Sequence, residues 1–175
     1  AAIADGSASA SLNSAGTALS VTYTPPSSST GTVDLKVLAD AITDGSGNKN
    51  DTLKTTATTT NSVSYDLQAP TLPQANIKIY SSTDTGKTSV LKVFDDNRSS
   101  LKVDFTFSEA VSNFTLDDVT VTSVNGQSAL TLSNLTPSSG SSTLYTADVV
   151  GLDQAEGTFT IGVASGSYTD ANGNE

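Results

Sequence analysis

Residues 157–175, GTFTIGVASGSYTDANGNE, decide how this chain folds. In the first half, Phe159, Ile161 and Val163 alternate with small or polar residues, which is the two-residue period of a β-strand with one buried face. The second half, TDANGN, is built from Asp, Asn and Gly, the residues that form tight turns. The stretch therefore predicts a strand followed by a turn.

The same pattern occurs earlier in the chain, at residues 31–49, as GTVDLKVLADAITDGSGNK. The two copies align without a gap at an offset of 126, the difference between positions 157 and 31, and the apolar positions and the T-D-x-x-G-N turn fall in register. The chain therefore holds one near-complete and one partial copy of a repeated β-unit. Tandem arrays generally serve reach and assembly rather than catalysis.

Period-2 alternation continues on both sides of these copies, and no helix is predicted. The predicted strands are 18–24, 32–39 and 53–66, then 75–80, 101–107, 114–122, 129–134, 143–150 and 158–168, with additional β-structure near 89–94 and short substitutes for early strands within 1–13.

A domain boundary is predicted at DLQAPTLP, residues 66–73, because two prolines each remove a backbone donor and stiffen the chain. This divides the chain into a partial unit, 1–68, and a sandwich domain, 69–175, that lacks a final strand. The alternative is a single domain with a proline-interrupted edge strand. Both units would leave strand edges unpaired, so either further sequence or a neighbouring chain must complete them.

Composition excludes several classes of function. The 175 residues carry a net charge of −10, which argues against nucleic acid and anionic membranes as partners and permits cation binding. There is no Cys and no His, so disulfides, Cys/His zinc sites and Ser-His or Cys-His catalysis are ruled out. No apolar run approaches the length of a membrane span. The absence of Cys fits a secreted surface protein.

Three motifs occur in a fixed order: F-x-F-S-E-x-V and F-T-x-x-D-V-x-V within residues 103–122, and Y-T-D-x-x-G-N at 168–174. Together with D-x-x-A-P at 66–70, they resemble the bacterial Ig-like domain repeats of giant, RTX-type cell-surface adhesins. The resemblance covers 101–174 well, 19–70 by its C-terminal half and 71–100 poorly. It implies an all-β, Ig-like antiparallel β-sandwich in tandem units, extracellular and non-enzymatic, often with calcium at domain junctions.

A calcium site is predicted at the linker end of the second unit. In a seven-stranded sandwich the B–C, D–E and F–G loops lie at the end where strand A enters. The oxygen-bearing residues there are Asp66, Glu109, Asp170, Asn172 and Asn174. Calcium takes six to eight oxygen ligands, and these segments can supply them. The alternative for the loop is a tight turn, with Glu109 as a solvated strand end.

The equivalent loop of the first unit offers a second metal candidate, with Asp44 and Asn48. It should face away from the linker. Its spacing begins like an EF-hand loop, but Ser46 and Lys49 break the pattern and no Glu stands at the twelfth position.

No catalytic group is predicted, and the protein is expected not to be an enzyme. The carboxylate pairs Asp95-Asp96 and Asp117-Asp118 are neighbours in sequence, so on a strand they would point to opposite faces and act as caps or solvated groups. The D-T-G triplet at residues 84–86 is read as a turn, because the surrounding strand pattern does not fit an aspartic protease.

The predicted function is an extracellular spacer or adhesion module of a repetitive bacterial surface protein, made rigid by calcium. The alternative is a subunit of a surface filament or S-layer assembled by strand donation. Expected partners are neighbouring repeat domains or copies of the same chain, with a cell-surface or glycan ligand elsewhere in the array. Sugar binding by this chain is disfavoured because Tyr80 is the only aromatic residue without a predicted structural place.

Overall fold

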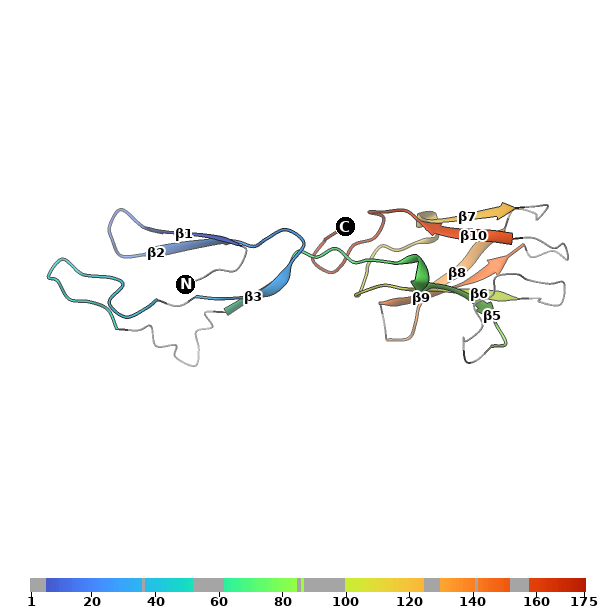
Figure 1. Ribbon diagram of the computed structural model, residues 1–175, viewed down its shortest axis with the longest axis horizontal. Helices are drawn as coiled ribbons and strands as arrows, with labels where there is room; N and C mark the ends of the chain where they lie inside the picture. The colour runs from blue at the N-terminus through green and yellow to red at the C-terminus, as the bar shows by residue number, and fades with distance from the viewer. Residues whose placement is uncertain are drawn as a thin grey trace. The chain divides into compact units, whose positions relative to one another are not determined.

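The computed structural model describes residues 6–35, 37–51, 62–84, 86, 100–124, 130–140, 142–151 and 158–175. The predicted all-β fold is confirmed: within these residues the only helical segments are two 3-10 turns, η1 (Gln74–Asn76) and η2 (Leu116–Asp118). The chain divides into two compact units, Ala1–Gln68 and Ala69–Glu175, which are drawn in Figure 1.

The second unit is an antiparallel sandwich of the Ig-like type. Its larger sheet has the strand order β5-β6-β9-β8, and its smaller sheet pairs β10 with β7. Figure 1 shows the smaller sheet lying over the larger one. The bounds are β5 (Ile77–Ser81), β6 (Leu101–Thr106), β7 (Val119–Val124), β8 (Thr131–Pro137), β9 (Leu144–Val150) and β10 (Thr158–Val163). With the strands lettered in chain order, the sheets are A-B-E-D and C-F, which is the immunoglobulin arrangement.

The core lies between these two sheets. Alternate residues of β6, namely Leu101, Val103 and Phe105, are fully buried, as the period of a strand with one buried face requires. Phe105 and Phe107 both meet the ring of Phe114 edge-to-face, with centroids 5.3 and 5.0 Å apart. Such T-shaped pairs add to the stabilisation from buried area alone.

The described residues of the first unit form two separate antiparallel ladders. One pairs β1 (Ser7–Leu12) with β2 (Leu19–Thr24), and the other pairs β3 (Thr30–Asp34) with β4 (Ser62–Asp66). No described residue of this unit is fully buried. Leu38 and Val63 are 65% and 67% exposed. The unit therefore has strands but no closed core among its described residues.

The repeat seen in the sequence has a structural counterpart. At the offset of 126, β1, β2 and β3 overlap β8, β9 and β10 in the same order, and the β1–β2 pair corresponds to the β8–β9 pair. The first unit thus contains strands D, E and F, and β4 follows them as strand G. Within its described residues it has no counterpart of β5, β6 and β7.

Several predicted strand limits are wrong. The strand predicted over 158–168 ends at Val163, because the chain turns through Gly166, whose φ is +72°. The strand predicted over 114–122 begins only at Val119, because the Asp118 carboxylate accepts hydrogen bonds from Thr115 N and Oγ1 at 2.7 and 3.0 Å and closes a 3-10 turn. The predicted β-structure near 89–94, and residues 53–61 of the strand predicted over 53–66, lie outside the described residues.

Candidate metal centre

The loop after β10 is shaped by the carboxylate of Asp170. Its Oδ1 accepts hydrogen bonds from the backbone N–H groups of Asn172 and Asn174 at 2.8 and 2.9 Å, and its Oδ2 accepts one from Asn174 Nδ2 at 2.7 Å. Gly173, at φ +85°, lets the chain turn back. The turn that the T-D-x-x-G-N pattern predicts is therefore present, with Asp170 at its centre.

Asp170 is only 4% exposed, yet its environment favours the ionised form. Burial raises the pKa of this carboxyl, but the hydrogen bonds from Asn174 and Asn172 outweigh that effect and hold the pKa below its ordinary value. A buried carboxylate that stays ionised is the type of group that a hard cation binds.

Three loops meet at the end of the second unit where the chain enters from the linker, as the strand order predicts. In the loop after β6, Phe107 N donates to Thr143 O at 2.8 Å, and Ser112 N donates to Thr169 O at 2.7 Å. These bonds join the B–C loop to the D–E and F–G loops. A carboxylate oxygen of Glu109 lies within 4.8 Å of one of Asp170. Two of the predicted metal ligands are therefore close together in one unit.

The start of the second unit is fixed to the same place. Thr71 N donates to Ser108 Oγ, and Ser108 N donates to Thr71 O, both at 2.9 Å. Ser108 immediately precedes Glu109 in the sequence, so these two hydrogen bonds hold Thr71 beside Glu109. Sequence reasoning did not find Ser108 or Ser112, because strand-end serines that pair with distant backbone leave no local pattern.

Asp66 belongs to the first unit, where it is the last residue of β4. It is half-buried, and its Oδ1 accepts a hydrogen bond from Gln68 N at 3.1 Å. This bond is an Asx turn, which directs the chain out of the strand.

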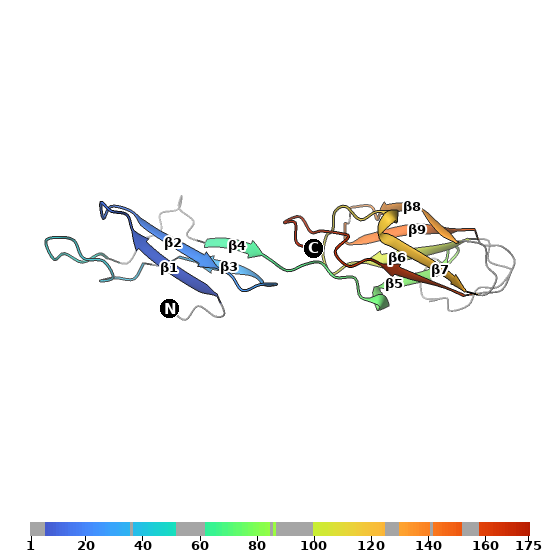
Figure 2. The same ribbon diagram turned by 90° about the horizontal axis from the view of Figure 1, so that it is seen from above.

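The loop with Asp44 and Asn48 repeats the hydrogen bonds of the Asp170 loop. Asp44 Oδ1 accepts from Ser46 N and Asn48 N at 2.9 and 2.8 Å, and Oδ2 accepts from Asn48 Nδ2 at 2.9 Å. The bonds from Asn48 and Ser46 lower the pKa of Asp44. This loop is exposed, and Figure 2 places it at the end of the first unit opposite the end of β4. It is therefore not brought together with Asp66.

A family model for a bacterial Ig-like domain matches residues 71–175, which is more than half of the chain. The chain belongs to the bacterial Ig-like domain family. No curated protein and no solved structure matches it. The match includes residues 71–100, where the sequence resemblance is poor.

Bacterial Ig-like domains are typically non-catalytic structural modules and are commonly found in surface-associated proteins. The remaining carboxylates of this member fit that description. Asp118 caps a 3-10 turn, and Asp84 Oδ1 accepts a hydrogen bond from Gly86 N at 3.1 Å in a turn. The pair Asp95-Asp96 lies outside the described residues. None of the helices in the described part of the domain is both long and apolar enough to cross a membrane.

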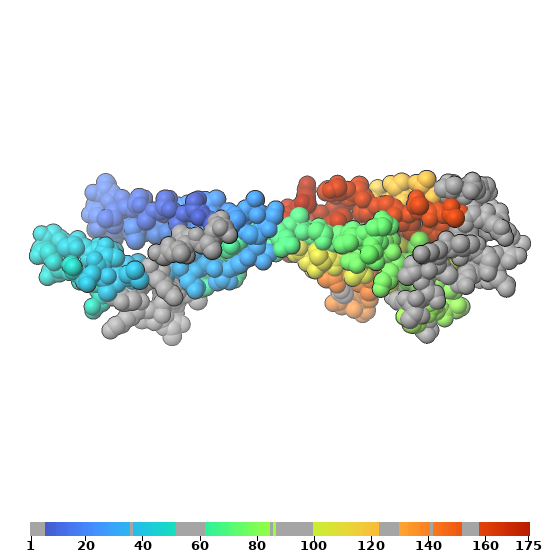
Figure 3. Space-filling model, viewed as in Figure 1, coloured from blue at the N-terminus to red at the C-terminus, as the bar shows by residue number. Residues whose placement is uncertain are grey.

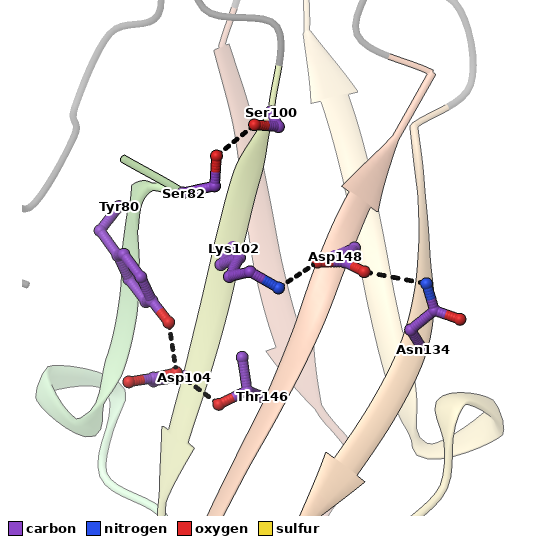
Figure 4. A network of polar contacts seen from close by, with 8 residues as sticks. All are labelled: Tyr80, Ser82, Ser100, Lys102, Asp104, Asn134, Thr146 and Asp148. Atoms are coloured by element: carbon purple, nitrogen blue, oxygen red, sulfur yellow. Dashed lines mark hydrogen bonds and ion pairs between the residues drawn. The ribbon is translucent and has the colours of Figure 1, made fainter. Parts of the chain in front are cut away.

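A polar network covers the outer face of the larger sheet in this Ig-like domain (Figure 4). Asp104, only 4% exposed, accepts hydrogen bonds from Tyr80 Oη at 2.9 Å and Thr146 Oγ1 at 2.8 Å. Beside it, Asp148 pairs with Lys102 at 2.6 Å and accepts from Asn134 Nδ2 at 2.9 Å. Tyr80 is thus a buried structural residue, and the network ties all four strands together. Alternation alone predicts these positions to be solvated, so the sequence does not reveal them.

Proposed function

We propose that this bacterial Ig-like chain is an extracellular spacer or adhesion module whose domain junction is stiffened by calcium. The observation that carries the proposal is the approach of the Glu109 and Asp170 carboxylates to within 4.8 Å of each other. Two ionised carboxylates at this distance repel unless a cation or a proton lies between them. A bound calcium ion removes that repulsion.

The donor set suits a hard cation. A carboxylate offers about four acceptor positions. The loop places two hydrogen bonds on Oδ1 of Asp170 and one, from Asn174 Nδ2, on Oδ2, so Oδ2 is the oxygen that we assign to the metal. Glu109 offers its carboxylate, and the exposed Asn172 offers its amide oxygen. Water and backbone carbonyls complete a calcium shell of six to eight oxygens.

Asp66 is the proposed ligand through which the bound ion would restrict the movement of the linker. Thr71 is bonded to Ser108, which precedes Glu109, and only five peptide steps separate Asp66 from Thr71. A chain of that length spans at most about 17 Å, so the Cα atom of Asp66 stays within that distance of Thr71. In the proposed state it joins Glu109 and Asp170 on the ion and fixes the linker.

Calcium titration of the full chain tests the proposal, with Glu109→Gln as the decisive variant. Calcium is expected to raise the melting temperature of the parent chain, because an ion bound only by the folded state stabilises it. Small-angle scattering is expected to show a stiffer particle than in chelator. Glu109→Gln keeps the size of the side chain, so it should abolish both responses while leaving the fold in chelator unchanged.

Asp44→Asn serves as the matched control, because it removes the carboxylate of the equivalent loop in the first unit. It should leave the calcium response at the junction intact. An equal response in the parent chain and Glu109→Gln would contradict the proposed site and leave Asp170 as a turn residue.

A second candidate function is a subunit of a surface filament or S-layer that assembles by strand donation. The observation that favours it is the exposed apolar surface of the first unit, where Leu12 and Val63 are more than half exposed. An unpaired strand edge beside such an apolar surface is a template for pairing with another chain.

A further inference from the structure

The two matched T-D-x-x-G-N loops of this chain differ at one position that bears on their chemical stability. At the repeat offset of 126, Asn172-Gly173 in the second unit corresponds to Ser46-Gly47 in the first. The two glycines have nearly the same backbone conformation, with φ +85° and +86°, and both loops are held by the same hydrogen bonds to an aspartate. The second unit therefore has an asparagine followed by glycine where the first unit has a serine.

The side-chain amide of Asn172 is accessible. Asn172 is exposed, and within the part of the chain that the structure describes only its backbone N–H is hydrogen-bonded, as a donor to Asp170 Oδ1 at 2.8 Å. In Figure 3 the last residues of the chain, drawn in the darkest red, lie on the visible surface of the second unit. Asparagine is among the chemically labile residues, so an accessible amide of this kind is open to reaction.

Gly173 supplies a nucleophile for that reaction. Its backbone nitrogen follows Asn172 directly and can close a five-membered ring onto the side-chain carbon Cγ. A Cβ atom built on Gly173 would meet nothing within 4 Å, so the space around it is open. The Gly173 N–H donates to Asp170 O at 3.3 Å, a long bond that holds the nitrogen weakly. Glycine has the largest backbone freedom of any residue, which lets this nitrogen approach Cγ.

The last asparagine of each loop lacks both features. Asn174 Nδ2 donates to Asp170 Oδ2 at 2.7 Å. In the same way, Asn48 Nδ2 donates to Asp44 Oδ2 at 2.9 Å. These bonds hold each side-chain amide against a carboxylate. Each of these asparagines is also followed by a residue with a long charged side chain, which crowds the next backbone nitrogen.

We propose that Asn172 is a site of spontaneous deamidation. The Gly173 nitrogen bonds to Cγ of Asn172 while the bond from Cγ to Nδ2 breaks, and the proton of the Gly173 N–H leaves with Nδ2 as part of ammonia. The reaction is favoured because both groups belong to one short segment. Water then opens the succinimide. Cleavage of the new bond to Cγ leaves aspartate, whereas cleavage of the original peptide bond leaves isoaspartate.

Either product changes the loop that carries Asp170. Aspartate at position 172 adds a negative charge beside the Asp170 carboxylate. Isoaspartate adds one carbon atom to the main chain between the two backbone N–H groups, of Asn172 and Asn174, that donate to Asp170 Oδ1. The isoaspartate form should therefore bind calcium less tightly. This consequence rests on the proposed function, whereas the deamidation itself is independent of calcium.

The test is to age the full chain in chelator at mildly alkaline pH and to map its peptides by mass spectrometry. Cleavage after Glu156 releases residues 157–175, in which Asn172 and Asn174 are the only asparagines. Asn172 is expected to convert at least about tenfold faster than Asn174. Electron-transfer fragmentation distinguishes isoaspartate from aspartate in the product.

Two reciprocal substitutions locate the cause. Asn172→Ser copies the first unit and should abolish conversion at that position in residues 157–175. Ser46→Asn copies the second unit and should create conversion at position 46 in the tryptic peptide 37–49, where Asn48 serves as the internal control. Both substituted positions are exposed, so neither change disturbs a buried group.

Three results would overturn the inference: an unchanged peptide 157–175 after ageing, equal conversion of Asn172 and Asn174, or a loop that stays intact in Ser46→Asn. A fresh chain with no calcium response would contradict the calcium proposal alone, because the ageing measurement contains no free metal.

Discussion

The two units of this chain contain the same three strands in the same order, yet among the residues that the structure describes only the second unit has a closed core. Val21 is 40% exposed, whereas Ala147, its counterpart in the second unit, is 1% exposed; Leu19 is 41% exposed, and its counterpart Tyr145 is 9% exposed. The difference lies in the neighbours, because the second unit has β5, β6 and β7. Hairpin pairing is local and forms in both units, whereas burial depends on strands far away in sequence.

Truncation of an apolar side chain is expected to give the largest difference between the two units in the loss of unfolding free energy. Phe105→Ala removes a fully buried ring and should destabilise the second unit by about 3–5 kcal/mol. Leu38→Ala in the first unit should change stability by less than about 0.5 kcal/mol, because that side chain is already in water. Denaturant unfolding, followed separately for each unit by amide exchange, measures both. Comparable losses would mean that the first unit has a core of its own.

The polar network should give an intermediate effect that is specific to the second unit. Tyr80→Phe removes one donor to the buried Asp104 and should cost about 1–3 kcal/mol. The outward positions of β2 that correspond to Thr146 and Asp148 are Ser20 and Thr22, so the first unit has no such network there. Thr22→Val is therefore expected to be near neutral. A neutral Tyr80→Phe would show that Asp104 is satisfied by its other partners.

The smallest expected effect is acid sensitivity of the two matched loops. Asp170 and Asp44 both have lowered pKa values, so each contributes stability that is present above the ordinary carboxyl pKa of 3.8 and is lost as pH falls through the lower, folded-state value. In Asp170→Asn and in Asp44→Asn, the free energy of unfolding should fall less between neutral and acid pH than it does in the parent chain. Thermal melts from pH 6 downward to about pH 2 check this. An unchanged acid slope in both variants would contradict it.

The sequence predicts most of the second unit because its strands are buried on one face. The residues of β6 and β9 alternate cleanly, and their strands were predicted to within one residue at each end. Where a side chain competes with strand pairing, prediction fails, as at Asp118, which holds a turn where β7 was expected to have begun.

At the candidate site, the sequence predicts what strand order determines and does not predict contacts that depend on the folded position of a distant backbone group. Glu109 and Asp170 could be paired from sequence because strand order alone brings the B–C and F–G loops to one end of a sandwich. Ser108, which fixes Thr71 beside Glu109, could not, because its partner is a backbone group whose position depends on the folded linker. Asp104 was missed because a buried carboxylate on an outward position breaks the alternation rule.

The T-D-x-x-G-N loop adopts the same hydrogen-bonded form in an exposed setting at Asp44 and in a buried one at Asp170. All of the bonds that define it come from within five consecutive residues. Its shape therefore travels with its sequence and needs no support from the host. For protein engineering, the loop should keep its hydrogen bonds and the position of its carboxylate when its five residues are inserted between two strand ends of another protein.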